Sequence, residues 1–194
     1  MTEIEMFLNR KLAIQCETED EAIELFRWLV HKGIIWRTGD PLTETNWDYQ
    51  YKEKTAYSLI TGGLSFYDAE ILKQEIEVVR YVDIPKDQLF IEIESLEDTI
   101  SFDTLSAKYA IHCRTKNESV ELFKFLGQLD VRQSASCRRC DEDDTLWDHF
   151  FRENTVYVVA NKSKLYCMEL SLAQRFGYKI IDVSDFSMEH PIKS

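Results

Sequence analysis

The chain has 194 residues, of which 44% are hydrophobic and 12% aromatic, so it can form a packed core and is not broadly disordered. Its formal net charge is −12, and residues 1–97 hold 10 Lys and Arg against 20 Asp and Glu. Phosphate contacts need cationic side chains, so this balance disfavours nucleic-acid binding by the first half and suits a basic protein partner. Without a long apolar run or a basic start, the chain is expected in the cytoplasm, with no membrane contact.

The first predicted elements are a strand over 11–16, which is short and apolar-rich, and a helix directly after it. Thr18 and Glu21 have the spacing of a capping box. Behind them, apolar residues recur at the intervals of a helix face that packs on a core, namely Ala22, Leu25, Phe26, Leu29 and Val30. Gly33 marks the predicted end of this helix.

A second group of elements is predicted up to residue 84. Residues 34–36 suggest a strand, and a polar loop follows over 37–46. Segments 55–60 and 64–67 flank a Thr-Gly-Gly turn and predict a hairpin. A short helix over 68–77 and a strand over 78–84 complete a β-α-β-β-β-(α)-β module, in which one main helix packs on a mostly antiparallel sheet. The sequence therefore predicts the α+β class.

This pattern occurs twice. Residues 11–29 and 108–126 are identical at ten of nineteen positions with a constant offset of 97. The match returns between 47–57 and 147–157, and again between 78–84 and 180–186. Three matching blocks in the same order indicate a tandem duplication. We expect a first repeat over 1–87, an acidic β-prone connector over 88–107 and a second repeat over 108–194.

Three tryptophans are candidate ligand-stacking residues. Trp47 and Trp147 recur in the two copies, each followed by Asp, and Trp36 follows the first main helix. In one interpretation they stack on a base while Arg138 and Arg139 hold phosphate. The alternative, which we favour, is that the recurring Trp-Asp pair plugs the sheet and closes a turn.

The five cysteines do not form a disulfide framework, since their number is odd and their positions are scattered. Cys137 and Cys140 form a C-x-x-C without the second ligand pair of a zinc site, so we expect neither a metal nor a cofactor. Cys16 and Cys113 recur at the ends of the matching strands, where buried thiols are expected. A cysteine nucleophile at Cys113, with His112 as its base, is the catalytic alternative.

Acidic side chains of the connector are the candidate partner-binding residues. Glu92 and Glu94 share one face of a predicted strand, about 7 Å apart, which is comparable to the spacing of phosphates along a nucleic-acid strand. Glu97 and Asp98 extend the same acidic stretch. A solvated strand face would have the same sequence, so the pattern permits phosphate mimicry without establishing it.

The repeated pattern A-I-x-C-x-T-x-x-E-x-x-E-L-F-x-x-L, followed by W-D and E-x-T-x-Y, resembles a small module of accessory proteins from phages and prophages of Gram-positive bacteria. Acidic phage proteins of this size resemble anti-defence inhibitors, including anti-CRISPR proteins. The second copy departs from the pattern at the helix exit, where Asp130-Val131-Arg132 replaces the Gly-Ile-Ile-Trp of the first.

The resemblance implies an inhibitor that is not an enzyme and has a host defence effector, such as a CRISPR nuclease, as its partner. It would bind the basic nucleic-acid-binding surface of that effector through its acidic face. Two alternatives remain open at this point. One is a nucleotide or small-molecule binder that acts as a signal sponge, and the other is a cysteine-dependent enzyme built on Cys113 or Cys140.

Overall fold

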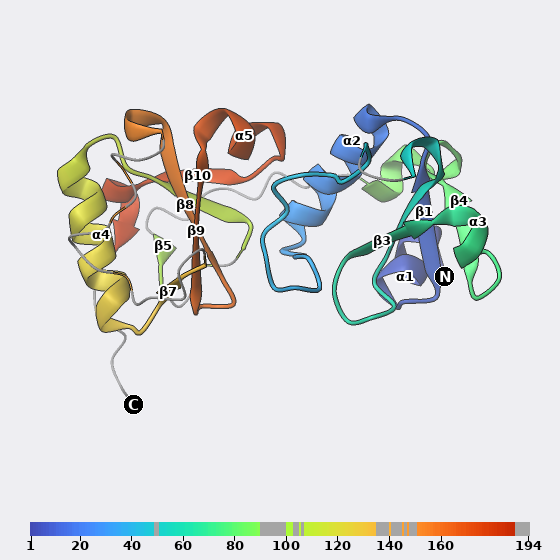
Figure 1. The fold of residues 1–194 in the computed structure, drawn as a ribbon, viewed down its shortest axis with the longest axis horizontal. Helices are drawn as coiled ribbons and strands as arrows, with labels where there is room; N and C mark the ends of the chain where they lie inside the picture. The colour runs from blue at the N-terminus through green and yellow to red at the C-terminus, as the bar shows by residue number, and fades with distance from the viewer. Residues whose placement is uncertain are drawn as a thin grey trace. The chain divides into compact units, whose positions relative to one another are not determined.

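The computed structural model describes residues 1–48, 51–89, 100–102, 105, 107–134, 140, 145, 147 and 151–188 (Figure 1). The chain divides into two units, Met1–Glu92 and Ile93–Ser194. Each unit contains helices packed on a β-sheet, so the predicted α+β class is confirmed. No helix in the described ranges is long and apolar enough to cross a membrane.

The first unit is built on a four-stranded sheet in the order β3-β2-β1-β4. Its strands are β1 (Leu12–Cys16), β2 (Thr55–Ser58), β3 (Ser65–Asp68) and β4 (Glu77–Arg80). β2 is antiparallel to β1 and β3, whereas β4 runs parallel to β1. The sheet is therefore mixed, because the chain returns to the far side of β1 through a helix and not through a second hairpin.

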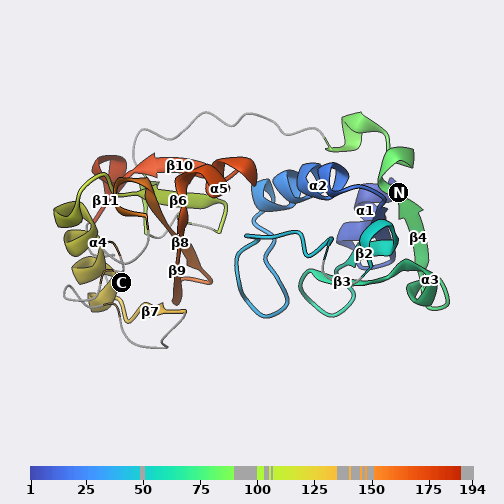
Figure 2. The same ribbon diagram turned by 45° about the horizontal axis from the view of Figure 1, so that its top comes forward.

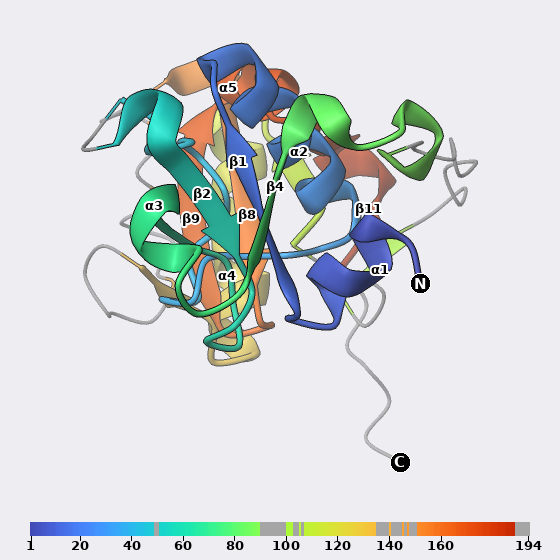
Figure 3. The same cartoon turned by 90° about the vertical axis from the view of Figure 1, so that its right-hand side faces the viewer.

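Helices cover both faces of this sheet, which explains why every residue of β1 is buried. α2 (Glu19–His31) packs on one face, where the ring of Phe26 lies edge-on to Tyr57 with 5.0 Å between centroids. α3 (Ala69–Leu72) packs on the opposite face, against Ala13 and Ala56. Figure 2 and Figure 3 show α2 and α3 on opposite sides of the sheet.

The beginning and end of the first unit are tied together. A helix that the sequence analysis did not predict, α1 (Glu3–Leu8), opens the chain and buries Phe7 completely. After β4 come two short 3-10 turns, η2 (Tyr81–Asp83) and η3 (Lys86–Leu89). Gln88 of η3 accepts a hydrogen bond from the Ile4 N–H at 3.3 Å, and its amide donates to the Glu3 carboxylate at 2.8 Å.

The second unit is built on a five-stranded sheet in the order β10-β6-β8-β9-β7. Its strands are β6 (Tyr109–His112), β7 (Arg132–Gln133), β8 (Thr155–Ala160), β9 (Lys164–Glu169) and β10 (Lys179–Asp182). β8 is antiparallel to both β6 and β9, while β10 runs parallel to β6 and β7 parallel to β9.

Two helices also cover the sheet of the second unit. α4 (Lys116–Gln128) and α5 (Leu170–Arg175) lie on opposite sides of it (Figure 1 and Figure 2). A two-stranded parallel sheet joins the ends of this unit, because β5 (Ile100–Ser101) pairs with β11 (Phe186–Ser187). Parts of the predicted connector over 88–107 therefore belong to the units. Residues 88–89 are in η3 of the first unit, and residues 100–101 form β5 of the second.

The two units share one pairing scheme. In each unit, the first long strand (β1 or β6) pairs antiparallel with the first strand of the hairpin (β2 or β8). On its other side it pairs parallel with the strand that follows the short helix (β4 or β10). The N-cap residues Thr18 and Thr115 have the same backbone angles, φ −129° and ψ 158°. Tyr57 donates to the Thr45 carbonyl at 2.6 Å, and Tyr157 donates to the Thr145 carbonyl at 2.7 Å. The origin of this likeness by duplication stays a prediction.

Several predicted details differ from the structure. Both sheets are mixed: two of the three described strand pairings in the first sheet and two of the four in the second are antiparallel, and the others are parallel. Residues 34–36 form no strand, and only Trp36 makes a single bridge to Leu64. The short helix predicted over 68–77 ends at Leu72, since the chain turns there before β4 starts at Glu77. The helix capped by Thr18 and the hairpin around Gly62 are confirmed.

Candidate functional site

An acidic surface of the first unit surrounds the start of α2. Its carboxylates come from five residues within one short stretch, and we call them the acidic α2 surface: Glu17, Glu19, Asp20, Glu21 and Glu24. All except the half-buried Glu21 are exposed. The fold places them there because Thr18 accepts the Glu21 N–H at 3.2 Å and so begins the helix directly after β1. Acidic side chains in a first helical turn also favour the helix dipole.

The same surface of the second unit carries a different charge. At the offset of 97, the five positions are occupied by Arg114, Lys116, Asn117, Glu118 and Glu121. The local backbone is the same, since Thr115 caps α4 and Glu118 completes a capping box. The two units therefore present equivalent helix starts of different charge: five carboxylates in the first, and two carboxylates balanced by two cations in the second.

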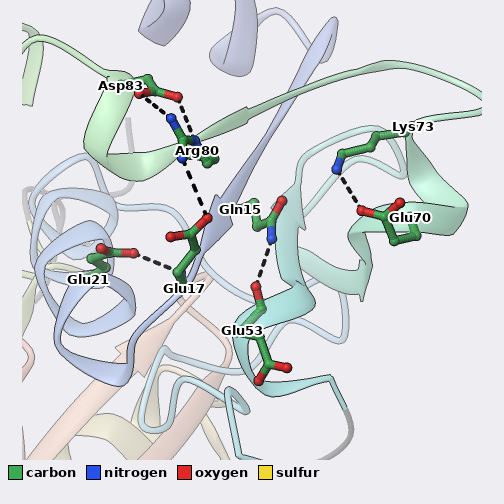
Figure 4. Close-up of polar contacts among 8 residues, drawn as sticks. All are labelled: Gln15, Glu17, Glu21, Glu53, Glu70, Lys73, Arg80 and Asp83. Carbon is green, nitrogen blue, oxygen red and sulfur yellow. Dashed lines mark hydrogen bonds and ion pairs between the residues drawn. The ribbon is translucent and has the colours of Figure 1, made fainter.

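An ion pair beside this surface is reversed in sign between the units. In the first unit, the Arg80 guanidinium of β4 lies 4.0 Å from the Glu17 carboxylate. It also donates two hydrogen bonds to the Asp83 carboxylate, at 2.8 and 3.0 Å (Figure 4). In the second unit, Arg114 pairs with Asp182 of β10. Glu17 corresponds to Arg114 and Arg80 to Asp182, so both charges are exchanged while the contact is kept.

The neighbouring residue of the central strand also differs between the units. Gln15 donates its amide N–H to the Glu53 carbonyl at 2.7 Å (Figure 4). At the equivalent position, His112 Nε2 lies 2.7 Å from the Glu153 carbonyl, and its Nδ1 lies 3.2 Å from the Asp182 carboxylate. Both ring nitrogens are thus engaged by structural partners, which is unfavourable for the predicted role of His112 as a general base.

The recurring cysteines are buried in the core. Burial, with Glu21 as a lesser cause, raises the pKa of Cys16 well above its ordinary value, and burial with Glu118 nearby does the same for Cys113. Burial also raises the pKa of Cys140 and of Cys167 to about 12. A nucleophilic cysteine reacts as the thiolate, so these groups stay in the unreactive thiol form near neutral pH.

Two of the three candidate tryptophans are engaged by contacts within the first unit. Trp47 donates its indole N–H to the Cys16 carbonyl at 3.0 Å, as a plug over the strand end. Trp36 packs edge-on between the rings of Phe26 and Phe66, with centroids 5.4 and 6.1 Å away. The buried indole N–H of Trp147 has no hydrogen-bond partner among the residues described. Trp36 and Trp47 belong to the first unit and Trp147 to the second.

The connector acids Glu92, Glu94, Glu97 and Asp98 lie outside the described residues, as do Cys137, Arg138 and Arg139.

A scan of protein-family models and searches of curated proteins and solved structures found no match. Within the described parts of the chain, no group of three or more His, Cys, Asp or Glu side chains could hold a metal ion.

The reversed ion pair was not singled out from the sequence, although the alignment of the copies contains its signal. Aligning 78–84 with 180–186 sets Arg80 against Asp182, and the first block sets Glu17 against Arg114. Two sign changes at aligned positions suggest a contact between them.

The reversed pair predicts a double-mutant cycle with a favourable coupling. In a His112→Gln background, which reproduces Gln15 of the other unit, Arg114→Glu should destabilise the second unit by placing two carboxylates together. Adding Asp182→Arg should restore the lost stability, with a coupling of about 0.2–1 kcal/mol, because both side chains are partly exposed. Urea unfolding of the four variants measures this coupling, and strictly additive effects would contradict it.

Proposed function

We propose that this chain is a binding protein whose first unit attaches to a cationic protein surface through its acidic α2 surface. The observation that carries the proposal is the contrast between the two helix starts. The same fold and the same Thr cap occur with Arg114 and Lys116 in the second unit, so the fold does not require Glu17 and Glu19 to be acidic. Exposed carboxylates on a rigid helix start give fast, salt-sensitive attraction to a positive groove.

The proposed partner is the basic nucleic-acid-binding surface of a host effector nuclease. This part of the proposal comes from the resemblance of the repeated pattern to phage accessory modules and of the whole chain to anti-defence inhibitors. The connector acids Glu92, Glu94, Glu97 and Asp98 would extend the negative surface along the chain. Binding there would block access of guide or target nucleic acid by occupying its cationic channel.

The proposal is tested by cleavage assays with a panel of purified guide-dependent nucleases, each assayed with increasing amounts of this protein. Inhibition of one nuclease at low salt is expected, with weaker inhibition at 0.5 M salt, where exposed charges are screened over a few ångströms. The variant Glu19→Lys with Asp20→Asn, which transfers the residues of the second unit, should weaken inhibition by about tenfold or more.

A matched variant keeps this test specific. Glu75→Lys with Glu77→Gln makes the same change in net charge at exposed positions away from the start of α2, because Glu77 pairs with Leu12 at the far end of β1, and should leave inhibition nearly unchanged. Reversing Glu92, Glu94, Glu97 and Asp98 to Lys tests the connector separately. Full inhibition by both the α2 variant and the connector variant would refute the charge-based function.

A further inference from the structure

A pocket of about 270 Å³ lies in the first unit between α2 and the turns that follow β4. Two of the side chains that line it are cationic, in a unit that is acidic overall. Its lining residues are Glu24, Arg27, Trp28, Tyr81, Lys86 and Leu89. In Figure 3 the turns after β4 lie beside α2. This pocket brings cationic and aromatic side chains together, but none of the predicted ligand-stacking residues Trp36, Trp47 and Trp147 is among its lining residues.

The polar groups of the pocket come from three different elements. Arg27 belongs to α2, Tyr81 to η2 and Lys86 to η3, so the two cations approach the pocket from separate walls. The Tyr81 hydroxyl donates to the Glu24 carboxylate at 3.0 Å, which fixes the ring. Burial, and then the contact with Glu24, raise the pKa of Tyr81, so this hydroxyl stays protonated.

The equivalent region of the second unit is filled by aromatic side chains. Phe125 of α4 takes the place of Trp28, and the rings of Phe102 and Phe186 lie against it with centroids 6.2 and 6.0 Å away. Val183, which is buried, takes the place of Tyr81. The shared fold thus accommodates apolar packing at these two positions, whereas in the first unit Trp28 and Tyr81 line a pocket together with two cations.

We infer that this pocket binds a small organic phosphate of about the size of a nucleoside monophosphate. The phosphate would lie between Arg27 and Lys86, and the planar ring would lie against Tyr81 and Leu89. Arg presents a planar fork of donors that matches phosphate oxygens, and Lys supplies a point charge from the other wall. The volume of about 270 Å³ is slightly below the roughly 300–1,000 Å³ that is typical of ligand pockets, which disfavours a dinucleotide.

This inference does not depend on the protein-binding function, because Arg27 and Lys86 are outside the acidic α2 surface. Glu24 belongs both to the acidic α2 surface and to the pocket, where its carboxylate repels a bound phosphate. Substituting Glu24 by Gln should therefore strengthen phosphate binding, whereas it should weaken attraction to a cationic protein. The opposite signs separate the two proposals.

The test is a titration of the full chain with AMP, adenosine and inorganic phosphate, followed by NMR of backbone amides and tryptophan indoles. AMP should saturate with a Kd below about 1 mM and shift the Trp28 indole and the amides of η2 and η3. Adenosine and inorganic phosphate should each bind at least about tenfold more weakly, since each lacks one half of the proposed contacts.

Variants decide whether the binding is at this pocket. Arg27→Gln and Lys86→Gln should each weaken AMP by about tenfold, and Glu24→Gln should strengthen it by about threefold. Lys73→Gln is the matched control, because Lys73 pairs with Glu70 at 2.7 Å on the other side of the sheet (Figure 4). The inference is overturned if AMP does not saturate, if adenosine or phosphate binds as well as AMP, or if Lys73→Gln has the same effect as Arg27→Gln.

Discussion

Replacing Gly127 by Ala is expected to destabilise the second unit by about 1–3 kcal/mol, although Gly to Ala inside a helix normally stabilises by up to about 1 kcal/mol. Gly127 is buried in the last turn of α4. A methyl group there would overlap the backbone carbonyl oxygen of Cys140. The Cys140 peptide cannot withdraw freely, because its N–H donates to the Val131 carbonyl at 3.0 Å. The cost of this overlap should outweigh the gain in helix propensity.

The measurement is the free energy of unfolding of each unit by hydrogen exchange, read on α4 for the second unit and on α2 for the first. Gln128→Ala is the matched control, since Gln128 is the exposed neighbour in the same turn, and it should change stability by less than about 0.5 kcal/mol. In the Gly127 variant the buried Cys140 thiol should also be alkylated faster. Unchanged or increased stability of Gly127→Ala would show that the Cys140 carbonyl moves aside at no cost.

Residue pattern and capping chemistry were sufficient to predict the main elements. The apolar stripe of Leu25, Phe26 and Leu29 is buried against the sheet, as its 3.6-residue spacing indicated. Thr115 caps α4 with the complete reciprocal box, whereas at α2 the Glu21 carboxylate accepts the N–H of Glu17 at 2.7 Å. These features are local, so they could be predicted from neighbouring residues alone.

Elements that depend on distant partners were predicted less well. The helix α1 has only six residues, and its apolar side chains Ile4 and Phe7 matter only because the rest of the unit packs on them. The parallel direction of β4 and β10 is a matter of topology, which strand propensity does not contain. Ile34 and Ile35 have strand propensity, yet the chain makes only one bridge, at Trp36, before it turns away.

The functional residues were also harder to predict from the sequence than the local structure was. Both Trp47 and the cysteines recur in the sequence because they complete the fold, and Trp47 is bonded to the carbonyl of Cys16. Recurrence between copies therefore indicated structure, whereas differences between copies indicated the surfaces that can serve binding. The pocket around Arg27 and Lys86 could not be predicted from sequence, because 59 positions separate its two cations along the chain.

The indole N–H groups of Trp47 and Trp147 give a second strong expectation, because the two units treat them differently. Trp47 donates to the Cys16 carbonyl, and its own carbonyl accepts from Thr55 at 3.3 Å. In the second unit, the Trp147 N–H and the Thr155 hydroxyl are both buried without a partner among the described residues. A buried donor with a hydrogen-bond partner stabilises the folded state. A buried donor without a partner lowers the stability of the folded state, because it has lost its hydrogen bonds to water.

Trp47→Phe should therefore destabilise the first unit by about 1–3 kcal/mol more than Trp147→Phe destabilises the second. The two substitutions remove the same atoms, so the loss of indole volume is common to both and largely cancels in the comparison. Only the first substitution takes a hydrogen bond away from the Cys16 carbonyl, and the second removes a polar group that the core does not satisfy. Hydrogen exchange on β1 and β6, each read in its own variant, measures the two losses. Equal losses would mean that the Trp47 hydrogen bond adds nothing to the first unit beyond the packing of the ring.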